Sequence, residues 1–172
     1  CVIMDADICD ELGIVPDDIH NFEDLTEVAR KVKEAHPELA IFPTGTNGDF
    51  LGPTGFDPLG TTGNNIFGGL ILEDNNLTVV NVFETEQFEE MIGYTNQWME
   101  EGLFINDPMN AQDGAVAYVS NNQAFCYLGG GFDPEVAAEV QQNNCGKRLY
   151  GAELSSTNYA TTDSVTGMMW CI

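Results

Sequence analysis

Basic residues are the scarcest feature of this 172-residue chain, which has five Lys and Arg residues against 28 Asp and Glu and a formal net charge of −23. No Lys or Arg lies between Glu34 and Gly146. A nucleic-acid-binding protein needs cations that neutralise phosphates and release counterions, and an anionic membrane surface would repel so acidic a chain. The composition therefore argues against nucleic acids, membranes and polyanionic ligands. It leaves a neutral or cationic solute, a protein partner or calcium.

Long apolar runs are also absent, so we expect no transmembrane helix, which needs roughly 18 apolar residues. The chain does begin and end in short apolar segments, Cys1–Met4 and Met168–Ile172. Domain ends are usually polar and frayed. We therefore expect both segments to be strands. We also expect the chain to be one lobe of a longer two-lobed protein, with these two strands at the hinge between the lobes.

Motifs for catalysis and for cofactor or metal binding are missing as well. The five cysteines include no C-x-x-C pair, and His20 and His36 belong to no H-E-x-x-H motif. There is no G-x-S-x-G motif and no G-x-G-x-x-G motif. The acidic stretch Asp107–Asp113 is loosely suggestive of calcium but lacks the loop pattern and its glycine. The sequence predicts no catalytic residues, no metal site and no cofactor, and we expect a protein that is not an enzyme.

Helical and strand patterns alternate along the chain, which indicates a mixed α/β sheet flanked by helices in a single domain over residues 1–172. Expected helices begin near Asp5, Asn21, Thr85, Ala111 and Asp133. Expected strands cover Leu39–Phe42, Phe67–Leu72, Thr78–Phe83, Ala124–Leu128, Arg148–Leu154 and Val165–Ile172. Thr44–Asn65 lacks periodicity, and a loop of that length is usually functional.

The best candidate site is the predicted strand Ala124–Leu128 with the glycines that follow it, Gly129, Gly130 and Gly131. Open α/β sheets bind ligands beyond the carboxyl ends of their strands. Phe132, directly after the glycines, is suited to stack on a sugar ring. Two interpretations stay open. These residues form either a ligand-binding turn or a structural turn at the start of a helix, with Phe132 packed in the core. Trp170 likewise has two interpretations, as a residue of the ligand-binding cleft wall or as a core residue.

Several segments together resemble family 1 extracellular solute-binding proteins. Met4–Ile14 is similar to the opening of that family's second lobe, and Phe22–Pro37 to the helix that follows. Segments similar to Phe56–Gly60, Thr78–Thr85 and Trp98–Ile105 recur in a LipO-like lipoprotein branch that often carries a DUF3502 domain. Tyr159–Ile172 resembles the return to the hinge. One departure is Asp5-Ala6, where the family more often has a basic pair before the aspartate.

The resemblance implies one lobe of a type 2 periplasmic-binding-protein fold. Two such lobes close over a solute, most often an oligosaccharide and sometimes a peptide, and deliver it to ABC permease subunits. It also implies a monomeric, lipid-anchored protein on the bacterial cell surface. The residues it suggests for ligand binding are Met4, Asp5, Gly129, Gly130, Gly131, Phe132, Tyr159 and Trp170.

Two other classes of protein remain open from the sequence. One is a carbohydrate-active enzyme, which would need two carboxylates across a cleft, and the abundant acidic residues supply many candidates that the sequence cannot rank. The other is a calcium-dependent surface interaction module. A sugar hydrolysis assay separates the first from a binding protein, and a calcium-dependent shift in melting temperature identifies the second.

Overall fold

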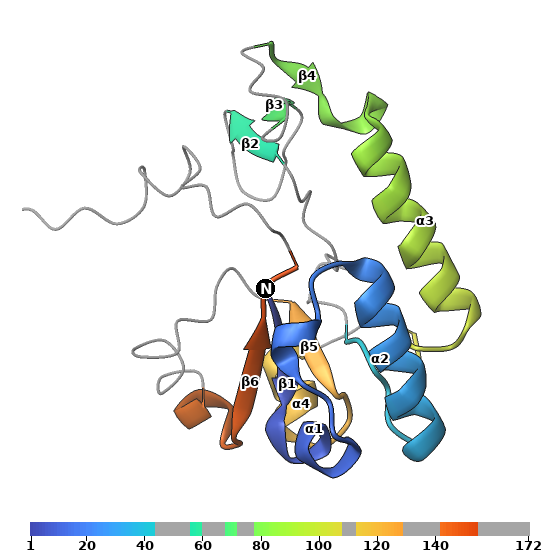
Figure 1. The fold of residues 1–172 in the computed structure, drawn as a ribbon, viewed down its shortest axis with the longest axis vertical. Coiled ribbons are helices and arrows are strands. Elements are labelled where there is room, and N and C mark those ends of the chain that lie inside the picture. Colours follow the sequence, from blue (N-terminus) through green and yellow to red (C-terminus); the bar gives the residue numbers. More distant parts are fainter. Residues whose placement is uncertain (44–55, 60–67, 72–77, 108–112, 129–141, 155–172) are drawn as a thin grey trace, which may run out of the picture. The chain divides into compact units, whose positions relative to one another are not determined.

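The computed structural model describes residues 1–43, 56–59, 68–71, 78–107, 113–128 and 142–154 (Figure 1). The chain divides into two compact units. Unit 1 comprises Cys1–Phe50 and Asn96–Leu154, and unit 2 comprises Leu51–Thr95 and Ser155–Ile172. Each unit is described by itself below. The predicted helix after Asp133 and the predicted strand Val165–Ile172 lie outside the described residues.

Unit 1 is built on the short, fully buried strand β1 (Val2–Asp5). It lies between β5 (Cys126–Leu128) and β6 (Leu149–Ala152), and both neighbours run antiparallel to it. Val2 pairs with Leu128 on one side and with Ala152 on the other. Since both neighbours oppose β1, they run parallel to each other.

Two further segments extend this sheet without forming full strands. Ala40 bridges Ala124 and Phe42 bridges Phe104, both in parallel. The Ile105 N–H donates to the Phe42 carbonyl at 3.1 Å, which continues the ladder. The predicted strand Leu39–Phe42 is therefore present only as isolated bridges. Across the layer, every segment except β1 runs in the same direction.

Helices cover the two faces of the sheet, as predicted for a mixed α/β layer. On one face Ile3, Tyr127 and Leu149 pack with Val119 of α4 (Ala115–Ser120) and with Cys145. Side chains alternate along a strand, so Met4, Cys126 and Tyr150 belong to the other face. On that face the Tyr150 hydroxyl reaches Asp10 of α1 (Ala6–Leu12).

Capping interactions between residues close in sequence account for where the first two α-helices begin and end. Helix α1 begins after Asp5 and ends at Gly13, whose left-handed φ of 62° accommodates the turn. A short 3-10 turn, η1 (Pro16–Asp18), leads to α2 (Phe22–Ala35). The Asn21 side chain accepts from the Asp24 N–H, and the Asp24 carboxylate accepts from the His20 N–H. These reciprocal bonds resemble a capping box, which confirms the predicted helix start.

Trp98 is the largest fully buried side chain of unit 1. Its ring lies 4.6 Å from that of Phe42 and 5.9 Å from that of Phe22, and its indole N–H donates to the Thr26 hydroxyl at 2.7 Å. Trp98 is therefore a core residue. Met99 lies one residue further along the helix, and it is 51% exposed.

Unit 2 contains an antiparallel sheet of β2 (Phe56–Leu59), β3 (Gly68–Ile71) and β4 (Val80–Asn81), in the order β2-β3-β4. Both strands predicted over Phe67–Leu72 and Thr78–Phe83 are present, and they pair with each other. The second strand is shorter than predicted, because Val82–Glu84 forms the 3-10 turn η2. The prediction of an unstructured loop over Thr44–Asn65 is wrong for Phe56–Leu59, which pairs with β3.

Helix α3 (Glu86–Glu100) follows η2. The Thr85 hydroxyl accepts from the Phe88 N–H at 3.3 Å, which confirms Thr85 as the predicted N-cap. The apolar side chains of this helix differ in their exposure, since Met91 is buried whereas Ile92 is 40% exposed.

Candidate binding site

The sheet of unit 1 has two distinct ends, which we call the carboxyl edge and the amino edge. The carboxyl edge is where the co-directional segments finish, at Phe42, Ile105, Leu128 and Ala152, beside the start of β1 at Val2. In Figure 1 the amino terminus, next to β1, lies at the end of β6 where this edge is formed. Ligands of open α/β sheets bind beyond the carboxyl ends of the strands. The carboxyl edge is therefore the candidate binding site.

Three segments that the sequence singles out come, in the order of the chain, directly after residues of this edge. Residue 44 follows Phe42 and Pro43, Gly129 follows β5, and the Ser/Thr-rich stretch before Trp170 follows β6 and Glu153. The residues Gly129, Gly130, Gly131, Phe132, Tyr159 and Trp170 lie outside the described residues, so their contacts with a ligand stay predictions. The described residues of the edge include the exposed side chains of Asn106, Asp107 and Glu153.

Met4 and Asp5 lie at the other end of β1. Met4 pairs with Cys126, Asp5 pairs with Leu149, and the Asp5 N–H donates to the Phe125 carbonyl. With a rise of about 3.3 Å per residue, Asp5 is roughly 10 Å along the strand from Val2. Both side chains are buried, with residue exposures of 0% and 3%. The structure therefore does not bring them to the carboxyl edge, and their predicted ligand contacts stay untested.

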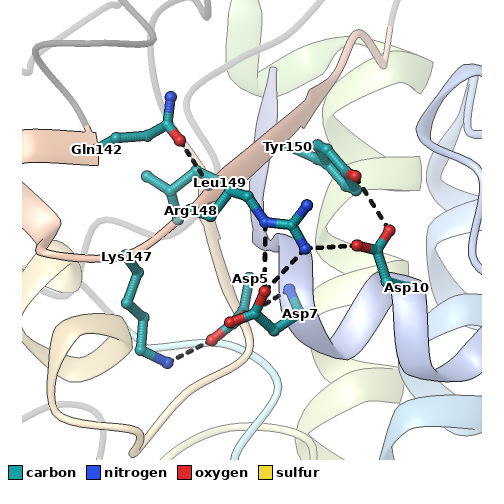
Figure 2. A network of polar contacts seen from close by, with 8 residues as sticks. All are labelled: Asp5, Asp7, Asp10, Gln142, Lys147, Arg148, Leu149 and Tyr150. Carbon is teal, nitrogen blue, oxygen red and sulfur yellow. Dashed lines mark hydrogen bonds and ion pairs between the residues drawn. The ribbon is translucent and has the colours of Figure 1, made fainter.

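Asp5 instead belongs to a polar cluster at the amino edge (Figure 2). Its carboxylate accepts from the Asp7 N–H at 3.0 Å, as the N-cap of α1, and forms an ion pair with Lys147. Arg148 bridges two carboxylates of α1, with its Nη2 at 2.8 Å from Asp7 Oδ1 and 2.5 Å from Asp10 Oδ2. These contacts join the start of β6 to α1. Sequence reasoning missed the cluster, because Asp5 and Lys147 are 142 positions apart in the chain.

The aromatic ring of Tyr150 completes the cluster. The Tyr150 hydroxyl donates to Asp10 Oδ1 at 3.0 Å, and the Arg148 guanidinium carbon lies 5.7 Å from the ring centroid. The hydrogen bond from Arg148, followed by that from Tyr150, lowers the pKa of Asp10. The hydrogen bond to Asp10 raises the pKa of Tyr150. Asp10, Arg148 and Tyr150 thus stabilise one another in the protonation states that form these hydrogen bonds. This behaviour indicates a structural role.

Buried thiols beside this cluster are held in the protonated form. Burial, with additional effects of Asp5 and Asp10, raises the pKa of Cys9 to about 12. Burial also raises the pKa of Cys126, which is fully buried in the sheet. A thiolate is the nucleophilic form of cysteine. These two cysteines therefore behave as small apolar residues.

A cavity of about 360 Å³ lies between the end of α1 and the first turns of α2. Its lining mixes buried Ile14 and Ile19 with the carboxylates of Asp18, Asp24 and Glu27. One of these carboxylates, Asp24, already caps α2. The cavity contains none of the residues that the sequence predicts for ligand binding.

Within the described residues, no group of three or more His, Cys, Asp or Glu side chains is placed to hold a metal ion. None of the helices they form is both long enough and apolar enough to cross a bilayer.

Comparison with known proteins gives matches among solved structures alone, since no family model and no curated protein matches the sequence. The N-glycan transport solute-binding protein NgtS of Streptococcus pneumoniae, in complex with Man1GlcNAc, superposes with a TM-score of 0.70 at 18% identity, over 90% of this chain and 33% of NgtS. Its complex with Man5GlcNAc gives the same values.

A second match is MsmE, a binding protein of Bacillus subtilis in an open conformation, with a TM-score of 0.57 at 13% identity over 91% of this chain and 39% of MsmE. The chain thus spans about a third of the length of the solved structures it matches. At such identities the likeness concerns the fold. The mixed α/β sheet flanked by helices is that of part of a solute-binding protein lobe.

Proposed function

We propose that this chain is the ligand-capturing lobe of a solute-binding protein of an ABC importer, and that it holds a neutral oligosaccharide against its carboxyl edge. The observation that carries the proposal is the convergence of co-directional segments at that edge. The segments that continue from it are the ones that the sequence singles out for ligand binding. The fold shared with NgtS and MsmE supports the same class of protein.

Charge supports a neutral ligand. With a net charge of −23, the chain repels anions. Of the five cations, Lys147 and Arg148 are paired with carboxylates at the amino edge, and Arg30 is paired with Glu101. An uncharged sugar donates hydroxyl hydrogen bonds to carboxylates and carbonyls without needing a cation. The ligands named for NgtS, Man1GlcNAc and Man5GlcNAc, are sugars of this kind.

The proposal extends to the setting of the full-length protein. It would act outside the cell membrane as a lipid-anchored monomer that passes its ligand to permease subunits. A second lobe would supply the other half of the contacts. The isolated chain should then bind more weakly than the full-length protein, because a single lobe offers only part of the site.

Isothermal titration of the full-length protein against a glycan panel tests the proposal. The panel contains Man1GlcNAc, Man5GlcNAc, malto-oligosaccharides and a sulfated oligosaccharide as the anionic control. We expect saturable binding of a neutral glycan, no binding of the anionic control, and weaker binding by Phe132→Ala and Trp170→Ala variants. Chromatography of the incubated glycans should show no cleavage. Cleavage would identify a carbohydrate-active enzyme, and failure to bind every neutral glycan would overturn the proposal.

A further inference from the structure

Apolar surface remains open to water at the cavity between the end of α1 and the first turns of α2, which we call the α1–α2 cavity. Within the described part of unit 1, the large apolar side chains that are exposed are Val15 and Met99. Val15, at 52% exposure, lines the α1–α2 cavity together with the buried side chains of Ile14 and Ile19. The cavity therefore combines an apolar floor with access from solvent.

Two carboxylates without a partner border this apolar floor. Asp18 of η1 and Glu27 of α2 line the cavity and are exposed. Among the described residues, neither carboxylate takes part in a hydrogen bond or an ion pair. Asp24 lines the same cavity but is engaged as part of the cap of α2. An apolar centre with a polar border is the usual composition of a protein interface.

The charge around the cavity is negative. Between Pro16 and Ala29 there is no Lys or Arg, whereas the acidic residues there are Asp17, Asp18, Glu23, Asp24 and Glu27. Lys31 is the cation in the lining, one helical turn after Glu27, and a pair of that spacing on an exposed helix face contributes little. The next cation, Arg30, is paired with Glu101. The cavity is therefore complementary to a positively charged group.

The exposure of the border indicates what kind of ligand fits. Sites for free small molecules enclose roughly 70–90% of the ligand surface. Of the residues that line the α1–α2 cavity, Gly13, Val15, Asp18, Glu27 and Lys31 are exposed. Its volume of about 360 Å³ is at the small end of the range for ligand pockets. A partner protein can insert a long side chain there and bury the exposed border with its neighbouring surface.

We propose that the α1–α2 cavity is a docking site for a partner protein and receives a lysine or arginine side chain that is flanked by an apolar residue. The aliphatic stem packs against Val15 and Ile19, and the charged end is attracted by the carboxylates of Asp18 and Glu27. Lys and Arg commonly bury their stems along apolar surface while their charged ends stay at a polar border. The inference goes beyond the proposed function, since these residues are separate from the carboxyl edge.

Amide NMR of the full-length protein tests the docking site with a matched pair of peptides. The probe is acetyl-Gly-Leu-Arg-Leu-Gly-amide, and its control carries citrulline, a neutral isostere, in place of arginine. We expect the arginine peptide to shift the amide signals of residues 13–31 in a saturable way. The citrulline peptide should bind the same residues with a Kd at least roughly fivefold higher, as loss of exposed ion pairs predicts. Agmatine, a free guanidinium compound, should bind more weakly than the arginine peptide.

Substitutions separate the charged and the apolar contributions. Asp18→Asn and Glu27→Gln should each raise the Kd of the arginine peptide roughly 2- to 5-fold, and in the double variant the two peptides should bind equally. Val15→Ser should weaken both peptides, because it removes apolar surface that each of them buries. The matched control is Glu34→Gln, at an exposed acid of α2 outside the cavity lining, which should leave both Kd values unchanged.

Several results would overturn the docking site. They are an arginine peptide that gives no saturable shifts at residues 13–31, equal binding of the two peptides by the wild type, and a preference for arginine that persists in the double variant. Agmatine that binds as tightly as the arginine peptide would identify a site for small organic cations instead. Equal weakening by Glu34→Gln would show that only the overall negative charge attracts the peptide. None of these results bears on glycan binding, so the proposed function is tested separately.

Discussion

The two edges of the unit 1 sheet use the same residue types in opposite ways. At the amino edge, Asp5, Asp10, Lys147 and Arg148 are joined by ion pairs and hydrogen bonds. At the carboxyl edge, the described acidic side chains of Asp107 and Glu153 are exposed. Acidic residues that join α1 to the sheet and acidic residues that are exposed at the carboxyl edge look alike in the sequence. The direction of each strand determines at which edge of the sheet an acidic residue lies, and therefore which of the two groups it belongs to.

The largest effect is expected from Trp98→Ala, because the carboxyl edge is packed on this ring. Trp98 is 0% exposed and contacts Phe42, one of the residues that end at that edge. Replacing a buried Trp by Ala typically costs about 3–5 kcal/mol in unfolding free energy. Urea denaturation followed by circular dichroism measures the loss. The exposed neighbour gives the control, since Met99→Ala should change stability by less than about 0.5 kcal/mol.

Asp5→Ala should destabilise the amino edge by about 3 kcal/mol. It leaves Lys147, whose side chain is 18% exposed, without its carboxylate, and it removes the acceptor for the Asp7 N–H. The double variant with Lys147→Met should be more stable than the sum of the single changes predicts, because the unpaired, partly buried ammonium is then gone. Denaturant unfolding of the wild type, the two single variants and the double variant gives the double-mutant cycle.

The same Asp5→Ala variant sharpens the comparison of the edges. If the amino edge is structural, glycan affinity at a temperature where the variant is folded should match that of the wild type. A loss of affinity without a loss of stability would instead favour the ligand contact that the sequence predicts for Asp5.

Features governed by near neighbours could be predicted from the sequence. The cap formed by Asn21 and Asp24, the helix stop at Gly13 and the burial of Trp98 all follow from spacing within a few residues. Each of these signals acts within one or two helical turns. The α/β class follows from the same local periodicities.

Features that depend on distant pairing could not be predicted. Asp5 and Lys147 are 142 positions apart, and no local pattern joins them. Strand β2 contains Pro58, which argues against a strand in sequence, yet pairing with β3 forms it. The family resemblance grouped Met4 and Asp5 with Gly129 in one site, and only the register of β1 with β5 reveals that Met4 pairs with Cys126 and not with Leu128 at the end of that strand.

Arg148→Gln should alter the response of the amino edge to acid. Arg148 is the main cause of the lowered pKa of Asp10. A carboxyl with a lowered folded-state pKa stabilises the fold above its unfolded value, about 3.9, and this contribution is lost as the pH falls through the folded value. The wild type should therefore lose more stability than the variant between about pH 5 and pH 2. Parallel acid-dependence curves for both proteins would contradict the assignment.

Tyr150→Phe should give the smallest effect, at the alkaline end of the same hydrogen bond. The bond to Asp10 raises the pKa of Tyr150 above its ordinary value of about 10. A group with a raised folded-state pKa contributes stability below the unfolded value and loses it as the pH rises through the folded value. The small stability difference between wild type and Tyr150→Phe should thus persist at neutral pH and shrink above about pH 10. Unfolding curves from pH 7 to pH 11 measure it, and a difference that stays constant across that range would mean that the hydroxyl does not bond to Asp10 in solution.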